Sequence, residues 1–463
     1  SANVFGSDKF DFHVAPTSIY SKKAGTWILG DSILMKIDST SLTLDNFHIS
    51  NNQQSIALEG TIAENKNEKF NISLNNIELS EWNGFISSEN LNLSGLLNLN
   101  GSISDLFGDV YFDATTTIDE LTINEYALGN LISDSKWNPE LSRVEMTGQI
   151  LNKKLKKGIK IKKGFYYPES VENPLDFGFV LNEFDIDFAN PFLPKDVISN
   201  LKGDLSGKIK LKGNLKAPKV NGKLRLNDGS MKVDMLNTTY AIDGLIVIKP
   251  DMIEVNGIPI KDKFGAQGTL VGSYYHKNYS SYSYDFYASF DQPFMVLNTT
   301  YKMNPLYYGD AFISGDVMME YDSINLLRID VTAKTENGTD LTLPLYGNDD
   351  VVLQDFISFN SLAEKEDVYD VDLEGVTMNL SIDLTNDAQF QLVFDEIVGD
   401  AMQGSGEGHI DMVIDQFSEF FMYGQYTLSN GSYLFTLKDF INKKFKVQPG
   451  GSISWYGDPY NAD

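Results

Sequence analysis

The C-terminal stretch of the chain decides its fold class. Residues 404–463 read GSGEGHIDMVIDQFSEFFMYGQYTLSNGSYLFTLKDFINKKFKVQPGGSISWYGDPYNAD. Ile410, Met412 and Ile414 alternate with other residues, and alternate residues of a β-strand share one face of the sheet. This spacing predicts a strand with one apolar face.

Turn-forming residues divide the same stretch. Asn430-Gly431 lies between the strand patterns at 424–428 and 433–437 and predicts a hairpin, because a tight primed turn needs positive φ at both central residues. Pro449-Gly450-Gly451 predicts another turn. The stretch as a whole predicts short strands joined by tight turns.

Similar alternating runs recur through the rest of the chain, bounded by Asn, Asp, Gly and Ser. Ile209 and Leu211 alternate with lysines, and Asp228-Gly229 predicts a turn further on. The best helix candidate is short, at residues 195–201 after Pro194. We expect an all-β chain with less than about a tenth of its residues helical, against about 30–35% in ordinary domains.

Glycine spacings also repeat along the chain. The spacing from Gly95 to Gly101 returns from Gly207 to Gly213, and the stretch at 222–230 resembles the stretch at 424–432. Repeats of one supersecondary unit indicate an elongated body in which each unit packs against its neighbours. We therefore predict one long repetitive sheet, antiparallel or mixed, rather than a sandwich.

Composition excludes several classes of protein. The chain has 463 residues, no cysteine and a net charge of −27. Without cysteine there is no disulfide, thiol nucleophile or thiolate metal site, and the acidic balance argues against nucleic acid as a partner. No apolar run approaches about 18 residues, the length of a membrane-spanning helix. No signal pattern follows Ser1, so we expect an internal piece of a longer protein whose anchor lies outside it.

No catalytic constellation stands out, and we expect neither an enzyme nor a cofactor. The glycines at 404–408 lack the Lys-Ser/Thr and the helix start of a phosphate cradle. Asp370, Asp372 and Glu374 share one strand face, which suits either a calcium ion or, more commonly, a solvated edge strand.

A lysine-rich run at residues 153–163 departs from the acidic balance, with seven lysines. Lysines on an edge strand protect it against aggregation. The alternative is a cationic patch for lipid headgroups or an acidic partner.

The C-terminal motifs resemble those of a known family. The glycine and aromatic pattern at 424–437, Pro449-Gly450-Gly451, and the run from Trp455 to Ala462 are similar to the C-terminal region of the TamB family, within the AsmA-like superfamily. The specific likeness covers about the last 95 residues. It implies a sheet curved into a trough with an apolar interior, the β-taco, in the periplasm between the inner and outer membranes of a Gram-negative envelope.

Two functions remain open at this point. The resemblance implies bridge-like phospholipid transport along an apolar groove, without covalent chemistry. The alternative that it implies is assembly of outer-membrane proteins with a β-barrel partner, TamA or a related barrel-assembly protein, through the C-terminal strands. A structural rod with a solid core is a third reading of the same periodicity.

The sequence also predicts domain boundaries and candidate site residues. We expect a repetitive β body at 1–353, an acidic link at 354–369 and a TamB-like region at 370–463. The groove candidates are Ile209, Leu211, Leu224, Leu226, Met231, Val233, Met378, Leu380, Ile382, Leu384, Ile410, Met412 and Ile414. The partner-binding candidates are Phe445, Val447, Ile453, Trp455, Gly457, Asp458 and Pro459.

Overall fold

The structure confirms an all-β fold. The computed structural model describes residues 2–463 except 5–8, 23, 64–66, 84–91, 107–109, 125, 153–156, 194–196, 215–216, 278–280, 305–306, 323–325, 345–374, 396–399, 418, 438–440 and 460. About 3% of the chain is helical, within the predicted limit. The described helical elements with defined bounds are three short 3-10 helices: η1 (Leu79–Trp82), η2 (Ile186–Phe192) and η3 (Asp234–Leu236).

The chain divides into two compact units. Unit 1 comprises residues 1–188, 204–224 and 248–250, and unit 2 comprises 189–203, 225–247 and 251–463. The link expected at 354–369 lies outside the described residues. Three strands contribute residues to both units: β15 (Ile198–Gly213), β16 (Pro218–Val233) and β17 (Thr238–Lys249).

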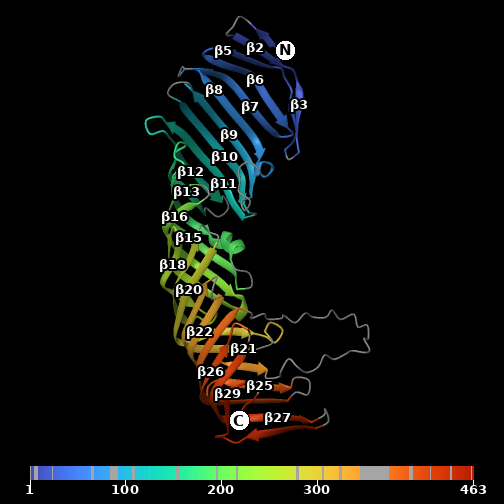
Figure 1. Cartoon of the computed structure of the whole chain (residues 1–463), viewed down its shortest axis with the longest axis vertical. Helices are drawn as coiled ribbons and strands as arrows, with labels where there is room; N and C mark the ends of the chain where they lie inside the picture. The colour runs from blue at the N-terminus through green and yellow to red at the C-terminus, as the bar shows by residue number, and fades with distance from the viewer. Residues whose placement is uncertain are drawn as a thin grey trace, which may run out of the picture. The chain divides into compact units, whose positions relative to one another are not determined.

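Unit 1 is an antiparallel sheet in which the strands follow chain order (Figure 1). From β6 to β15 each strand pairs with the next. The first strands depart from this order, because β6 pairs with both β4 and β5. In turn, β4 pairs with β3, and β5 pairs with β2. The strands that lie wholly within this unit are β1 (Ala2–Val4), β2 (Lys9–Val14), β3 (Thr17–Ser21), β4 (Gly25–Leu29), β5 (Ile33–Asp38), β6 (Ser41–Asn51), β7 (Gln54–Ala63), β8 (Lys69–Glu78), β9 (Leu93–Ser104), β10 (Tyr111–Ile123), β11 (Tyr126–Asn138), β12 (Arg143–Asn152), β13 (Lys157–Tyr166) and β14 (Leu175–Asp185).

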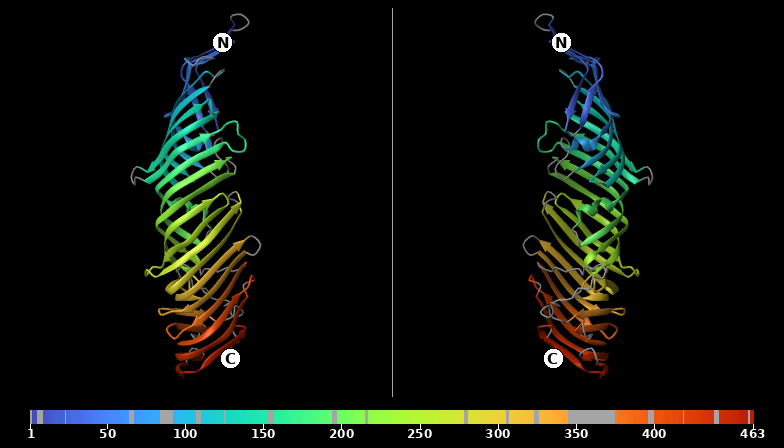
Figure 2. Two further views of the ribbon diagram at one scale, coloured as in Figure 1. Left: turned by 90° about the vertical axis from the view of Figure 1, so that its left-hand side faces the viewer. Right: turned by 90° about the vertical axis from the view of Figure 1, so that its right-hand side faces the viewer.

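Unit 2 begins in the same antiparallel way and then becomes mixed. The strands that lie wholly within it are β18 (Met252–Lys261), β19 (Gln267–Lys277), β20 (Ser281–Thr299), β21 (Tyr308–Asp322), β22 (Leu326–Thr335), β23 (Asp340–Pro344), β24 (Val376–Leu384), β25 (Gln389–Asp395), β26 (Asp400–Ile414), β27 (Phe420–Leu437), β28 (Ile441–Val447) and β29 (Ser452–Gly457). β24 pairs in parallel with β22, and β25 in parallel with β23. Both then pair with β26, which pairs with β27. The two views in Figure 2 show the strands of each unit following one another side by side.

Threonines fix the corners where unit 2 strands break in two. Between β22 and β23, the Thr339 hydroxyl accepts a hydrogen bond from the Phe312 amide and donates one to the Phe312 carbonyl, both at 3.0 Å. At the neighbouring corner, the Thr385 hydroxyl donates to the Thr335 carbonyl at 2.9 Å. These bonds replace ladder hydrogen bonds at each break, so adjacent strands bend at the same place.

The hairpin predicted at Asn430-Gly431 and the turn predicted at Asp228-Gly229 are both wrong. Asn430-Gly431 lies inside the continuous strand β27, and Asp228-Gly229 lies inside β16. A Cβ on Gly229 would lie 2.3 Å from the carbonyl oxygen of Ile242, and Asp228 has a φ of 49°. These dipeptides therefore allow close approach and local bulges in long strands, which a bend in a sheet also requires. The turn at Pro449-Gly450 is present and joins β28 to β29.

The short helix expected at 195–201 is also wrong for the residues described there. Residues 198–201 open strand β15. The Asn190 side-chain amide donates to the Leu201 carbonyl and accepts from the Leu201 amide, both at 2.9 Å. The Asn190 side chain thus pairs with both the amide and the carbonyl of Leu201, as the backbone of a neighbouring strand would.

Edge protection does not explain the described part of the lysine-rich run, residues 157–163, since it lies in β13, which is not an edge strand. It pairs with β12 on one side and with β14 on the other. Its described lysines, Lys160, Lys162 and Lys163, are exposed.

Candidate functional site

One row of side chains crosses seven neighbouring strands of unit 1 and is apolar throughout. Each member is the cross-strand partner of the next, and we call the row the unit 1 ladder: Ile77 (β8), Leu97 (β9), Ile118 (β10), Leu131 (β11), Ile150 (β12), Ile159 (β13) and Leu181 (β14). The end residues are buried, and the five between them are half-buried. At about 4.8 Å between strands, this row runs for roughly 30 Å.

Unit 2 contains a second row of the same kind. The unit 2 ladder consists of Ile258 (β18), Leu270 (β19), Ala288 (β20), Val317 (β21), Val331 (β22), Leu380 (β24), Met412 (β26) and Met422 (β27). Again the two end residues are buried and the six between them are half-buried. The parallel pairing of β22 with β24 keeps Val331 opposite Leu380, so the row continues where the topology becomes mixed.

The face opposite the unit 2 ladder is polar and internally paired. Ser381 donates to an Asp411 carboxylate oxygen at 2.7 Å, and Asn379 donates to Asp330 at 2.6 Å. His409 Nδ1 lies 2.7 Å from Asp383 Oδ1, and this hydrogen bond raises the pKa of the imidazole. On β22, β24 and β26 the apolar side chains and the hydrogen-bonded polar ones therefore lie on opposite faces.

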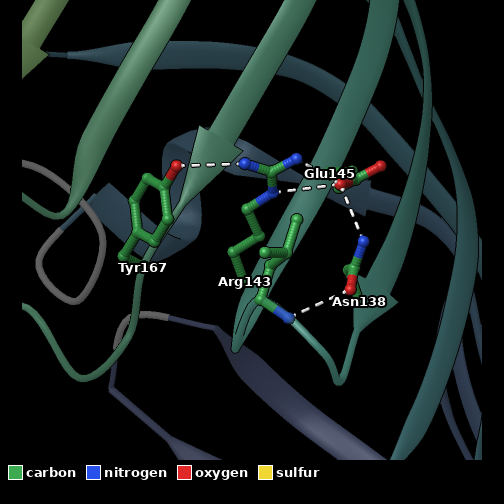
Figure 3. A network of polar contacts seen from close by, with 5 residues as sticks. Asn138, Arg143, Glu145 and Tyr167 are labelled. Carbon is green, nitrogen blue, oxygen red and sulfur yellow. Dashed lines mark hydrogen bonds and ion pairs between the residues drawn. The ribbon is translucent and has the colours of Figure 1, made fainter.

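A polar network holds the corresponding face of unit 1 (Figure 3). The Arg143 guanidinium donates to Glu145 Oε1 at 2.6 Å and to the Tyr167 hydroxyl at 3.2 Å, and it lies 3.7 Å from the centre of the Phe165 ring. Arg143 Nε donates to the same Glu145 oxygen at 3.0 Å, and the Asn138 side-chain amide is its third donor, also at 3.0 Å. The hydrogen bond from Arg143 is the main reason that the pKa of Glu145 is lowered.

Tyrosines next to the apolar face remain neutral. Burial raises the pKa of Tyr426 to about 12, and its ring packs edge-on against Phe390 with 5.8 Å between ring centres. Tyr426 belongs to a buried cluster with Ile410, Met422 and Trp455. The apolar face of unit 2 therefore gains no charge from this phenol at neutral pH.

None of the thirteen groove candidates is fully exposed. Six are buried and seven half-buried, whereas Lys208, Lys210 and Asp411 on the alternate positions are exposed. The buried ones are Leu224, Leu226, Val233, Met378, Ile410 and Ile414, and the half-buried ones are Ile209, Leu211, Met231, Leu380, Ile382, Leu384 and Met412. Leu380 and Met412 belong to the unit 2 ladder.

The structure separates the partner-binding candidates into two groups. Phe445 on β28 is 43% exposed, and Asp458 is also exposed. Trp455 is only 4% exposed and packs in the C-terminal core, against which Val447 and Ile453 are half-buried. Gly457 and Pro459 are buried, and the Trp455 indole donates to the Pro459 carbonyl at 3.2 Å. Most of this set thus holds the terminal strands together.

The remaining motifs do not form sites in the described structure. Glycines 404, 406 and 408 lie in β26, where added Cβ atoms would come within 2.4 Å of β27 carbonyl oxygens. Asp370, Asp372 and Glu374 lie outside the described residues. Within the described part of the chain, no group of three or more His, Asp or Glu side chains could hold a metal ion.

Sequence reasoning missed most of the ladders. All seven unit 1 members and six of the eight unit 2 members were absent from the groove candidates. Alternation identified the face of each strand, but the row depends on how strands are paired. Bulges shift that register, as between Ile118 and Leu121 and between Leu181 and Phe184. Residues with left-handed backbone at Glu120 and Glu183 mark both shifts.

Comparison with protein families then places the chain. A model described as the TamB N-terminal domain matches residues 14–226, and one described as the TamB C-terminal domain matches residues 256–463. The chain belongs to the TamB family. The match extends well beyond the last 95 residues, so the N-terminal β body is TamB sequence as well. No curated protein and no solved structure matches the chain.

TamB membership fits a component of the bacterial envelope that acts in lipid transport or protein assembly. A search of the described residues for a helix long and apolar enough to cross a membrane finds none.

Proposed function

We propose that this TamB chain conducts phospholipid between the inner and outer membranes of a Gram-negative envelope, with acyl chains in contact with the apolar face of each unit. The observation that carries the proposal is the pair of ladders. Their central side chains remain half-buried, so each unit presents an apolar row that water still reaches. Covering such a row is favourable, at about 0.8 kcal/mol for each methylene removed from water.

The chemistry of the ladders suits acyl chains better than a defined small ligand. Every side chain in both rows is aliphatic, alanine or methionine, so nothing in them fixes an orientation by hydrogen bonding. The flexible side chain of the half-buried Met412 suits acyl chains of different shape. Neighbouring groove candidates such as Ile209, Leu211 and Ile382 widen the same faces.

The test compares adjacent residues that face opposite ways. Leu131 belongs to the unit 1 ladder, whereas Ile132, the next residue on β11, is 47% exposed. A photo-crosslinking amino acid at Leu131 or Leu380 should trap phospholipid in cells, and the same group at Ile132 or Asp411 should not. Equal capture from the two sets would contradict the assignment, since all four sites carry the same reactive group.

A second candidate function rests on the terminal strands. β28 and β29 both pair with β27, along different stretches. The chain end covers β29, because the Ser454 and Asp463 backbones exchange hydrogen bonds at 2.9 and 3.0 Å. Among the described residues, β28 has β27 as its one strand partner, and a barrel of the TamA or barrel-assembly type would add a strand there.

Crosslinking at the two exposed aromatic residues of these strands distinguishes barrel-protein assembly from lipid conduction. Phe445 lies on β28 and Tyr456, 73% exposed, lies on β29. Strand addition predicts that a crosslinker at Phe445 captures the outer-membrane barrel and that one at Tyr456 does not. Lipid capture at Leu131 without barrel capture at Phe445 would leave conduction as the function.

A further inference from the structure

Six exposed lysines lie on the face of unit 1 that is opposite the ladder. We call them the lysine face: Lys160, Lys163, Lys208, Lys210, Lys212 and Lys223. Lys160 is opposite Val180 of β14, which is opposite Lys208 of β15, and Lys163, Gly178 and Lys210 form the next row. The lysines therefore form a two-dimensional array over neighbouring strands rather than a single line.

The array continues from β15 to β16. A Cβ on Gly222 would lie 2.4 Å from the Lys208 carbonyl, and one on Gly207 would lie 2.3 Å from the Lys223 carbonyl. These approaches place Lys208 opposite Lys223 on adjacent strands. Like charges directly opposite each other destabilise a sheet, so the fold gains nothing from this arrangement.

Few carboxylates neutralise the face. Asp176 lies 3.0 Å from Lys212, the one ion pair found for the six lysines within the described residues. Glu145, at the border of the array, accepts its hydrogen bonds from Arg143 and Asn138, and the charge of Lys163 also contributes to the lowered pKa of its carboxyl. Lys160, Lys208, Lys210 and Lys223 have no ion pair within the described residues, so a chain with a net charge of −27 concentrates positive charge on one patch.

The chemistry of the patch indicates what it binds. Lysine is depleted in protein–protein interfaces, which favour aromatic residues and arginine. The aromatic ring at the border, Phe165, is covered by the Arg143 guanidinium at 3.7 Å. Lysines are compact point charges without the planar fork that recognises one phosphate in a fixed orientation. An array of such charges suits a layer of mobile anionic groups.

We propose that the lysine face docks on the headgroup layer of an anionic phospholipid membrane. This docking is separate from acyl-chain conduction, because it uses the opposite face of the same strands. Each lysine near an anionic surface contributes roughly a fivefold gain in affinity, equivalent to about 1 kcal/mol. Without the patch, the acidic remainder of the chain is repelled by the same surface.

The experiment measures sedimentation of the whole 463-residue chain with vesicles of phosphatidylglycerol and phosphatidylcholine at low salt. The patch variant carries Lys160→Gln, Lys163→Gln, Lys208→Gln and Lys210→Gln. The control carries Lys9→Gln, Lys36→Gln, Lys69→Gln and Lys334→Gln, four exposed lysines outside the patch, and has the same net charge. Circular dichroism verifies that both variants are folded.

We expect the original chain and the control to bind, and the patch variant to bind at least about a hundredfold more weakly. Binding should fall at about 0.5 M salt and be absent from pure phosphatidylcholine vesicles, because surface charge is screened or missing there. The proposal is overturned if the original chain does not bind, or if patch and control variants lose affinity equally. It is also overturned if polyglutamate or DNA binds the patch more tightly than the vesicles do, since the partner is then an acidic polymer.

Discussion

His409 links the stability of unit 2 to pH through two carboxylates. Its Nδ1 lies 2.7 Å from Asp383 and its Nε2 lies 3.3 Å from Asp411, on the two strands β24 and β26. The hydrogen bond to Asp383 is the largest cause of the raised pKa. A raised pKa means that the folded state binds the proton more tightly than the unfolded state does.

The direction of the pH effect follows from that shift. The stabilisation is fully present below about pH 6.5, the unfolded pKa of histidine, and disappears as pH rises through the higher folded value. We expect Asp383→Asn to lower the His409 titration midpoint measured by NMR, and to flatten the loss of stability above pH 6.5. An unchanged midpoint in Asp383→Asn would show that the carboxylate does not hold the proton. The effect is small, because the imidazole is 53% exposed and solvent screens the pair.

Gly424 shows why β26 and β27 require glycine at some positions. Its φ is +123°, and a Cβ there would lie 2.1 Å from the His409 carbonyl oxygen. We expect Gly424→Ala to destabilise the β26–β27 pair by more than about 2 kcal/mol, because the substitution combines backbone strain with a clash. Hydrogen exchange of amides in both strands should then accelerate by more than about 25-fold.

Gly451 provides the matched control for that substitution. Its φ is outside the left-handed region, and the nearest atom to an added Cβ is 3.5 Å away. Gly451→Ala should leave exchange in β26 and β27 within about threefold of the original, a change below about 1 kcal/mol. Equal acceleration by both substitutions would mean that the close approach at Gly424 is not what matters.

The strands illustrate how far the sequence predicts this fold. In β16, Leu224 and Leu226 are buried and the intervening Lys223 and Arg225 are exposed, a pattern that alternation in the sequence makes visible. The same local reasoning failed at Asn430-Gly431, where a favourable turn dipeptide lies inside an 18-residue strand. Pairing with the neighbouring strand decides whether Asn430-Gly431 forms a turn or continues the strand, because β26 pairs with β27 on both sides of Gly431. Turn propensity depends on the local sequence, whereas the need for a glycine in the strand arises because the backbone of a neighbouring strand lies too close for a Cβ.

The ladders show the corresponding limit for the candidate site. Each depends on register across seven or eight strands, and one slip of one residue turns a strand's apolar side outward. Leu131 and Ile132 are both apolar, so sequence alone does not distinguish the ladder member from its exposed neighbour. Only the pairing of Leu131 with Ile118 and Ile150 does so.

The whole chain is organised by the contrast between its two faces. The apolar row of unit 2 lies opposite paired polar side chains on β22, β24 and β26, and that of unit 1 lies opposite the lysine face. The net charge of −27 favours solubility despite those rows. Conduction along the chain would require an uninterrupted apolar row in each unit. A single fixed charge on either ladder should therefore act on transport far more than on folding.

Two pairs of adjacent substitutions test this requirement. In unit 1, Leu131→Asp places a carboxylate on the ladder, and Ile132→Asp places it on the exposed face of the same strand. In unit 2, Val331→Lys alters the ladder, and Thr332→Lys alters the exposed position next to it. Each pair has the same change in net charge and differs in the face that carries it.

We expect the two ladder variants to reduce phospholipid delivery to the outer membrane by at least about tenfold, because an unpaired charge in an apolar path costs several kcal/mol. The two controls should deliver lipid normally. Delivery and barrel-protein levels are measured in cells that carry each variant at normal abundance. Ladder variants that fold and deliver lipid normally would falsify conduction. Assembly through the terminal strands predicts normal barrel-protein levels in the Leu131→Asp variant, since Leu131 lies more than 300 residues before β28 in the chain.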